Sequence, residues 1–464
     1  MTYPYGTKGA PVVGNGLGGL PRRAVAGAAA AFTPRFLATT TLSTVLDRVA
    51  PLDASSFLWY ANNTTLQMSY ATNTQIIQRA GIGQSLVSDG QFLYDIAPAG
   101  STIRRWGTDL LSFSVAKTYS SSSGGAMNPF LLGLGPDSLF FLSATGTNQV
   151  VKLDKNLTTV AWARSIVSSV GTTVLRGLLG TSDGGCIVTG YVHNDAGTNS
   201  DYGYAYIVKF SSTGVREWER VFQDSSNRFS IALDPSETDD AFYFRYAFDG
   251  GGSDGGIFEF LTRIDKSDLS ITGCSYGGNS DYWGSGSIGL GFSQYALHPS
   301  KRFAVAIFGG GSGAKATLAV LTKASATDVM FNRVNYYDLN SSLPTVASAR
   351  GQHTSIFNIG DNFVISGRLR EEFTGANTKY FCGVFTFNDP SQLKIAGSDT
   401  ETIDLSTHSS ICLKPMLFNA TRDSAPATTT KTVNISNTTI TVTDAGTGTS
   451  TAATTVTIID TITA

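Results

Sequence analysis

Residues 181–192 read TSDGGCIVTGYV, and this stretch places a polar turn, Ser182 to Gly185, directly before a largely apolar run, Cys186 to Val192. Asp and Gly favour turns, whereas Ile, Val and Tyr favour strands. Residues 201–222 then supply a strand ending in AYIVKF, a turn SSTG and another strand carrying Trp218. With the apolar run LLG at 178–180 before the polar turn, the segment predicts four consecutive antiparallel strands joined by short turns.

The same strand-turn-strand pattern recurs along the chain. Residues 148–167, NQVVKLDKNLTTVAWARSIV, repeat it with Lys152 and Trp162 in the places of Lys209 and Trp218. Weaker copies give one equivalent position in each unit: Arg105, Lys152, Lys209, Arg263, Leu321 and Phe385, at steps of 47, 57, 54, 58 and 64 residues. A strand pair with a polar turn precedes each of these positions, so every unit holds four strands.

Repeated four-stranded units are typical of a β-propeller, in which each unit is one blade. Six blades follow from the six copies, and residues from Ser55 onward have the form of a seventh. We predict an all-β, six- or seven-bladed propeller over residues 39–415, an extended N-terminal arm over 1–38 and a C-terminal Thr-rich β-hairpin arm over 416–464. A β-helix or a stacked sandwich array is the structural alternative.

The two best copies resemble bacterial propeller repeats of the type DGGYIVAG followed by VKLDxNGxVxW, related to pyrroloquinoline-quinone-type tandem blades. One copy matches at eight positions: Asp183, Gly184, Gly185, Ile187, Gly190, Lys209, Gly214 and Trp218. The other matches at Lys152, Leu153, Asp154 and Trp162. The resemblance implies the fold and no particular activity, because such propellers serve enzymes, adhesins and scaffolds.

The amino-acid composition limits the kinds of binding partner and cellular setting that we expect for this chain. The 33 basic and 35 acidic residues give a net charge of −2 without a basic face, which indicates no nucleic-acid partner. No apolar run is long enough to span a bilayer, and no ordinary secretory signal is visible, although residues 21–32 faintly resemble a twin-arginine leader. The spacing of the four cysteines fits neither a zinc site nor a dense disulfide framework, so we interpret them as small buried hydrophobes.

The two ends of the chain differ in character from the repeats. Residues 1–38 are rich in Gly, Ala and Pro, and the C-terminal segment alternates apolar with polar residues on either side of an expected turn, DAGTGTS at 444–450. Such strands are marginal alone, so we expect them to pair with the propeller or with neighbouring subunits. The candidate assembly residues are Val433, Ile435, Ile440, Val442, Val456, Ile458 and Ile462.

The sequence offers only weak motifs for catalysis, metal binding or cofactor binding. Residues 12–19, VVGNGLGG, lack the strand, helix and acidic residue of a dinucleotide loop, and no nucleophile elbow, P-loop or zinc-protease motif occurs. The four histidines lie far apart in sequence, so we predict no catalytic residue, no metal and no cofactor. Tyr282 and Trp283, in a glycine-rich loop, are candidate glycan contacts, with packing at a blade edge as the alternative.

Three functions remain open. The first is a non-enzymatic structural or attachment protein of a bacteriophage virion, a tail, fibre or capsid-associated component that binds other virion proteins, copies of itself or a host-surface glycan or receptor. It rests on a resemblance in composition and arm-plus-domain layout. The second is a bacterial cell-surface adhesin or glycan-binding propeller. The third is a propeller enzyme acting on a sugar or an alcohol; we favour the first.

Overall fold

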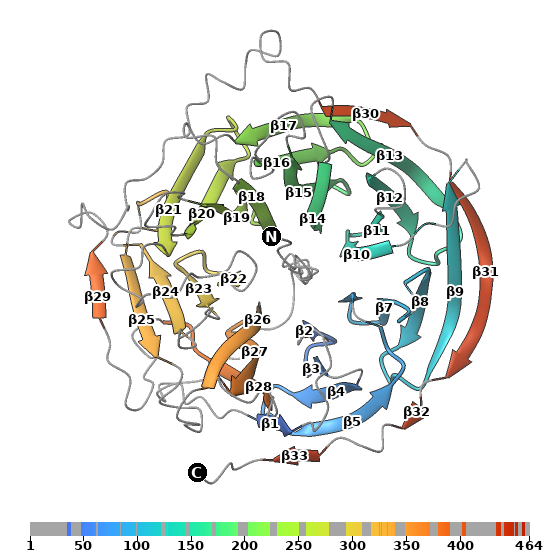
Figure 1. The fold of residues 1–464 in the computed structure, drawn as a ribbon, viewed down its shortest axis with the longest axis horizontal. Coiled ribbons are helices and arrows are strands. Elements are labelled where there is room, and N and C mark those ends of the chain that lie inside the picture. Colours follow the sequence, from blue (N-terminus) through green and yellow to red (C-terminus); the bar gives the residue numbers. More distant parts are fainter. Residues whose placement is uncertain are drawn as a thin grey trace.

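Apolar side chains on both faces of the repeated strands require a sheet that is covered on both sides, and a ring of sheets provides this. In the computed structural model, seven antiparallel sheets surround a central axis as a seven-bladed β-propeller, which confirms the predicted fold (Figure 1). Ile187 and Val188 show the packing directly. Both are fully buried. Ile187 packs in the core shared with the next blade along the chain, and Val188 packs in the core shared with the preceding blade.

The structure describes residues 35–38, 48–61, 64–83, 85–98, 100–121, 127, 129–143, 148–168, 173–193, 203–222, 230–249, 257–277, 294–308, 317–323, 325, 327–331, 333–338, 349–371, 379–389, 401–404, 433–437, 440–449, 451–452 and 457–459. All regular elements in these ranges are strands. They include no helix long and apolar enough to cross a membrane.

Six of the blades are meanders whose first four strands run outward from the axis in chain order. Blades 1 to 3 are β2 (Arg48–Pro51), β3 (Ser56–Ala61), β4 (Thr64–Ser69) and β5 (Gln75–Ala80); β6 (Leu86–Ser88), β7 (Phe92–Ile96), β8 (Thr102–Gly107) and β9 (Ser112–Ser121); and β10 (Pro129–Leu134), β11 (Ser138–Ser143), β12 (Asn148–Asp154) and β13 (Val160–Ser168). Blades 4 to 6 are β14 (Thr173–Gly180), β15 (Cys186–His193), β16 (Gly203–Phe210) and β17 (Arg216–Phe222); β18 (Ser230–Glu237), β19 (Ala241–Asp249), β20 (Ile257–Asp265) and β21 (Ile271–Gly277); and β22 (Gln294–Leu297), β23 (Phe303–Phe308), β24 (Thr317–Thr322) and β25 (Arg333–Asp338).

The seventh blade closes the ring with strands from opposite ends of the chain. Its first three strands are β26 (Ala349–Ile359), β27 (Asn362–Glu371) and β28 (Lys379–Thr386), and its fourth is β1 (Arg35–Ala38), antiparallel to β28. The segment 1–38, predicted as an arm, therefore contributes a strand to a blade. This pairing ties the beginning of the ring to its end.

The repeat positions chosen from the sequence fall on equivalent strands. Arg105, Lys152, Lys209, Arg263, Leu321 and Phe385 lie on β8, β12, β16, β20, β24 and β28, the third strand of six successive blades. The residues from Ser55 form β3 to β5 of a further blade, so the count is seven. Cys186 and Cys382 are both fully buried, as the interpretation of the cysteines as small hydrophobes requires. Cys412 lies outside the described residues.

In blades 2 to 5, the turn between the third and fourth strands holds a residue in the left-handed region. Leu110, Leu157 and Leu269 hold it at φ of 57°, 63° and 57°, and Gly214 holds it in blade 4 at φ 78°. Leu110 and Leu157 are fully buried in the cores between blades, which offsets a strain of roughly 1–2 kcal/mol. At Gly214, a Cβ would lie 2.6 Å from the Trp162 ring of blade 3, so this turn excludes a side chain.

This difference predicts unequal costs for two glycine substitutions. Gly90→Ala, at φ 85° with open space around it, should lower the free energy of unfolding by about 1 kcal/mol through backbone strain alone. Gly214→Ala adds the collision with Trp162 to the backbone strain, so it should lower the free energy of unfolding by clearly more than Gly90→Ala does. Urea unfolding of both variants measures the difference, and equal losses would contradict the close packing of this turn against blade 3.

Candidate functional site

The outer edges of the blades carry the strands that the sequence assigned to assembly. Five strands, here called the rim strands, pair antiparallel with the outermost strand of a blade (Figure 1). They are β29 (Glu401–Asp404) on β25, β30 (Val433–Asn437) on β13, β31 (Ile440–Thr449) on β9, β32 (Thr451–Ala452) on β5 and β33 (Thr457–Ile459) on β1. Each adds a fifth strand to its blade.

The last four rim strands follow the circumference against the order of the blades. They lie on blades 3, 2, 1 and 7 in turn, and appear in red around the edge of Figure 1. The final one, β33, pairs with β1, so strands near both ends of the sequence share the sheet of blade 7. The strand pair that closes the ring and the last C-terminal strand therefore lie in the same blade, blade 7.

The predicted C-terminal hairpin is wrong in its pairing, because β30 to β33 each pair with a different blade instead of with one another. The expected turn DAGTGTS is largely strand: β31 continues through it to Thr449, with irregular register at Gly446 and Gly448. Gly446 adopts φ 90°, and Asp444 Oδ1 accepts a hydrogen bond from its amide at 2.9 Å. Bulges of this kind let a strand follow a curved edge.

β31 is the rim strand whose side chains are described most fully. Val442 is half-buried and packs on the core between blades 2 and 3, while Lys117 of β9 forms a 3.2 Å ion pair with the largely exposed Asp444. A Cβ on Gly448 would lie 2.4 Å from the ring of Phe113. The remaining side chains between 443 and 449 are exposed, so main-chain pairing dominates this contact.

The candidate assembly residues are thus distributed over three blades. Val433 and Ile435 lie in β30, Ile440 and Val442 in β31, and Ile458 in β33. Val456 and Ile462 lie outside the described residues, as do the candidate glycan contacts Tyr282 and Trp283.

Two blade edges differ from the others. Within the ranges described, the sheets of blades 4 and 5 have four strands, ending at β17 and β21. β17 reads REWERVF, and its Arg216 and Glu217 are exposed. Charged side chains on an edge strand disfavour the addition of another strand. The part of β13 paired with β30 contains one charged residue, Arg164, beside Ile166 and Val167.

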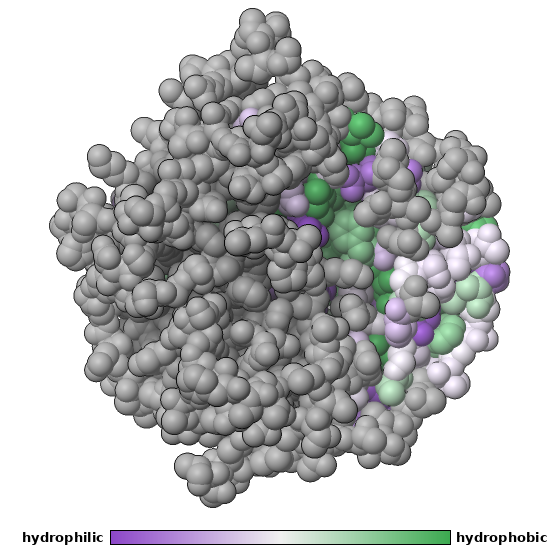
Figure 2. Space-filling view, viewed as in Figure 1, coloured by the Kyte–Doolittle hydropathy of each residue, from purple (hydrophilic) through white to green (hydrophobic). Residues whose placement is uncertain are grey.

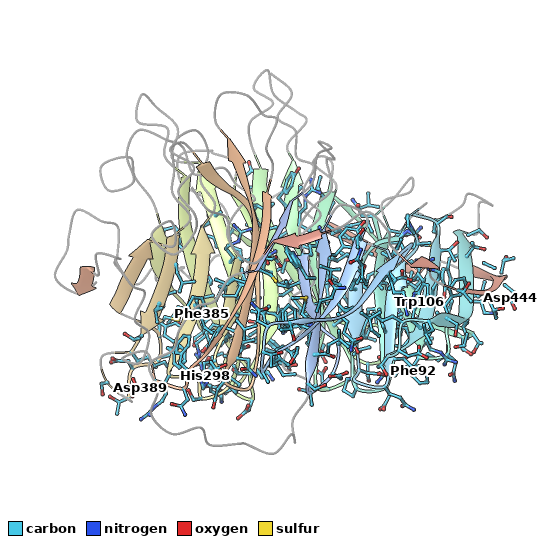
Figure 3. The ribbon with its side chains drawn as sticks, turned by 90° about the horizontal axis from the view of Figure 1, so that it is seen from below. Phe92, Trp106, His298, Phe385, Asp389 and Asp444 are labelled. Atoms are coloured by element: carbon cyan, nitrogen blue, oxygen red, sulfur yellow. The ribbon has the colours of Figure 1, made fainter. Side chains whose placement is uncertain are left out.

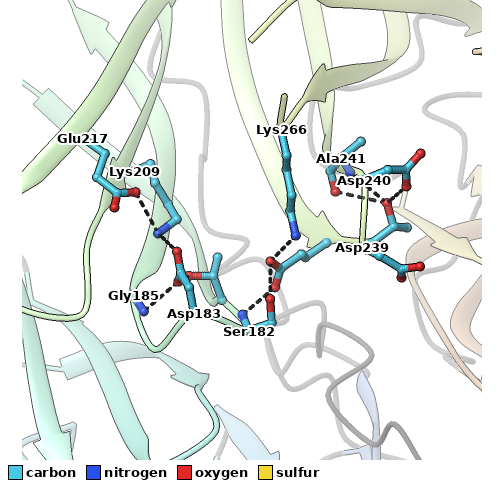
Figure 4. A network of polar contacts seen from close by, with 12 residues as sticks. Ser182, Asp183, Gly185, Lys209, Glu217, Asp239, Asp240, Ala241 and Lys266 are labelled. Carbon is cyan, nitrogen blue, oxygen red and sulfur yellow. Dashed lines mark hydrogen bonds and ion pairs between the residues drawn. The ribbon is translucent and has the colours of Figure 1, made fainter. Parts of the chain in front are cut away.

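One face of the propeller is made of short turns, among them the turns at His298 and near Phe92 (Figure 3). Polar contacts on this face join neighbouring blades. Glu237 of blade 5 accepts hydrogen bonds from the amide and hydroxyl of Ser182 in blade 4, at 2.7 and 2.8 Å, and pairs with Lys266 at 2.6 Å (Figure 4). Lys152 of blade 3 donates to Gly184 O at 2.8 Å in the same turn. Sequence reasoning missed these contacts, because no spacing rule relates residues of different blades.

His298 makes a similar contact between blades 6 and 7. Its Nε2 lies 3.1 Å from Asp361 Oδ1, and its Nδ1 lies 2.6 Å from the hydroxyl of Ser300. The imidazole is buried and stacks on Phe303 with ring centroids 4.4 Å apart. Ser300 belongs to the same turn, where its amide donates to His298 Nδ1, so the hydroxyl serves that turn. No cluster of three His, Cys, Asp or Glu residues suited to a metal occurs in the part of the chain that is described.

The turn in the opening stretch is held by Asp183. Its carboxylate accepts hydrogen bonds from Thr181 Oγ1 at 2.6 Å and Gly185 N at 2.9 Å, and pairs with Lys209 Nζ at 2.8 Å (Figure 4). Burial acts to raise the pKa of Asp183, but the hydrogen bonds and the charge of Lys209 outweigh it. The pKa therefore lies below its usual 3.8.

A lowered pKa makes the contribution of Asp183 depend on pH. The ionised carboxylate stabilises the fold above about pH 4, and this stabilisation is lost as the pH falls through the folded-state pKa. Asp183→Asn should therefore lower the free energy of unfolding at pH 7 by less than about 1 kcal/mol, since the side chain is 51% exposed. Urea titrations from pH 7 to pH 2 should show the two proteins converging, and a constant gap would contradict this assignment.

The close approach of Gly448 to Phe113 gives a test of the rim. Gly448→Val should displace β31 from β9, because its side chain would occupy the position of the Phe113 ring. Proteinase K should then cut within residues 440–449 at least several-fold faster. Thr447→Val, on an exposed position of the same strand, is the matched control and should be cut as slowly as the unmodified protein. Equal cleavage of all three would show that β31 does not depend on this contact.

Comparisons with known proteins give only distant structural likenesses. No family model and no curated protein matches the chain. Similar solved structures include the β-propeller domain of Cps50 (Swd1) from Myceliophteria thermophila, with 10% identity, a TM-score of 0.44 and coverage of 76% of this chain and 100% of that one. Extracellular domains 1–2 of Drosophila Semaphorin 1a have 8% identity and a TM-score of 0.42, and the match covers 76% of this chain and 89% of that one. Kluyveromyces lactis Hsv2 has 8% identity and a TM-score of 0.40, with coverage of 77% of this chain and 98% of that one.

Proposed function

We propose that this protein is a non-enzymatic structural component of a large assembly, specifically a tail, fibre or capsid-associated protein of a bacteriophage virion. In this role the propeller is a rigid body displayed outward, for packing or for attachment to a host. The C-terminal strands join neighbouring copies by adding to their blade edges. Partners are then other copies of the chain and other virion proteins.

The observation that carries the proposal is the main-chain character of the rim contacts. β30 to β33 pair through N–H and C=O groups over a register of five, eight, two and three residue pairs. A blade edge that recognises backbone accepts the same strand from its own chain or from another copy. Exchange of identical elements between copies is a low-cost way to link subunits.

The surface and the composition also favour dense packing among neighbours. Charged residues make up 15% of the chain, below the roughly 25% that is usual for soluble domains. On the face shown in Figure 2, the described rim of blade 2 is largely pale, the colour of intermediate hydropathy. Such a surface meets a neighbour with a small desolvation cost, because few ions lose water.

Removal of the C-terminal segment tests the role of the rim strands in assembly. A chain that lacks residues 421–464 should lose oligomerisation, or incorporation into particles, while its circular dichroism remains that of a folded β protein. Light scattering coupled to size exclusion measures the first property. A truncated chain that assembles normally would contradict the proposal. Glycan binding that is lost in Trp283→Ala would instead favour the adhesin alternative.

Cysteine pairing separates exchange between copies from pairing within one copy. Thr118 and Thr443 are register partners across β9 and β31. Copies with only Thr118→Cys and copies with only Thr443→Cys, carrying different tags, should form a disulfide-linked heterodimer after co-expression and oxidation. Thr118→Cys paired with Thr447→Cys is the control, because Thr447 lies outside the paired register. Cross-linking confined to single chains that carry both Thr118→Cys and Thr443→Cys would contradict exchange.

A further inference from the structure

The joint between blades 7 and 1, here called the seam, is the place where the ring closes. The fourth strand of blade 7 is β1, which pairs with β28 over four residues, the fewest among the fourth strands of the seven described blades. In the other six blades, the fourth strand follows the third after a connection of ten residues or fewer. The register partners Ala38 and Lys379 lie 341 positions apart in the chain. The pairing that closes the ring therefore has the least local support of the seven.

The C-terminal strands cross the seam on its outer side. β31 pairs with blade 2 over eight residue pairs, β32 continues on blade 1, and β33 pairs with β1 in blade 7 (Figure 1). Phe36, Leu37 and Ala38 of β1 thus lie between β28 on one side and β33 on the other. One run of chain is attached to the blades on both sides of the seam.

The length of chain between β32 and β33 limits how far the seam can open. Four residues, 453–456, separate Ala452 at the end of β32 from Thr457 at the start of β33. A fully extended chain spans at most about 3.6 Å per residue, so these two strand ends cannot lie further apart than about 18 Å. Wider separation of blades 7 and 1 requires β33 to leave β1, or the strands on blades 1 and 2 to detach.

We propose that β33 is a clasp that keeps the propeller ring closed, because it covers the outer edge of β1 and is tied to blades 1 and 2. A four-residue strand at an open edge is paired on one side only, whereas β33 adds three register pairs to the four that β1 makes with β28. Loss of β33 should then release β1 from β28, although β1 separates β33 from β28 in the sheet. The clasp acts within one copy, so it does not rest on the proposed assembly role.

Backbone hydrogen exchange in a chain that ends at Ala452 tests the clasp. This chain keeps β30 to β32 and loses β33, and a chain that ends at Ile459 is the matched control. The amides of β28 that face β1 should exchange faster by a factor of about ten or more in the shorter chain, because release of β1 exposes them to water. In the control, these amides should stay as protected as in the full chain.

A second variant keeps β33 and weakens its tie to blade 1. Insertion of a flexible Gly-Ser segment of about twenty residues between Ala453 and Thr454 lengthens the connection roughly six-fold, which lowers the closure constant of the tie by roughly ten-fold. The same amides of β28 should then exchange faster by up to about ten-fold. No change in this variant would overturn the role of the tie.

The amides of β28 separate the clasp from a simple loss of contact, because β33 does not pair with β28. Unchanged protection of these amides in the chain that ends at Ala452 would overturn the proposal, since β1 would then hold its place without β33. An equal loss of protection in β15 of blade 4 would also overturn it, because the destabilisation would not be confined to the seam.

Discussion

The outermost strand of a propeller blade carries a row of N–H and C=O groups that the blade itself cannot pair. In this protein that constraint acts at two places. The pairing of β28 with β1 joins the end of the ring to its beginning, and β29 to β33 add a fifth strand to five of the seven blades. Both arrangements use main-chain pairing, so strands as short as β1 and β33 can add to a blade.

Side chains hold the blades to one another once the ring is closed. Residues such as Ile187 and Val188 point into the cores on opposite sides of one sheet, so each blade depends on both neighbours. Polar contacts between turns, such as Ser182 with Glu237, add specificity on one face. A body braced in this way suits a role as a rigid, displayed platform.

The repeat made the blades predictable, and the edges were harder to predict for a physical reason. Arg105 and Phe385 could be matched across the sequence because each lies on a strand that is followed by a short turn and another strand. Edge pairing recognises backbone, so the four residues of β1 and the Thr-rich rim strands carry little pattern that names their partner. The DAGTGTS segment looked like a turn because Asp and Gly favour turns, yet the same residues form bulges in β31.

Hydrogen exchange of the backbone amides measures the central claim most directly. In the full chain, the outward-facing amides of β9 and β13 should be protected, because β31 and β30 cover them. In a chain that ends before Val433, these amides should exchange far faster, while the amides of β17 and β21 should be unchanged. Unaltered protection of β9 and β13 in the shortened chain would contradict the account, because it would mean that the C-terminal strands do not cover the blade edges.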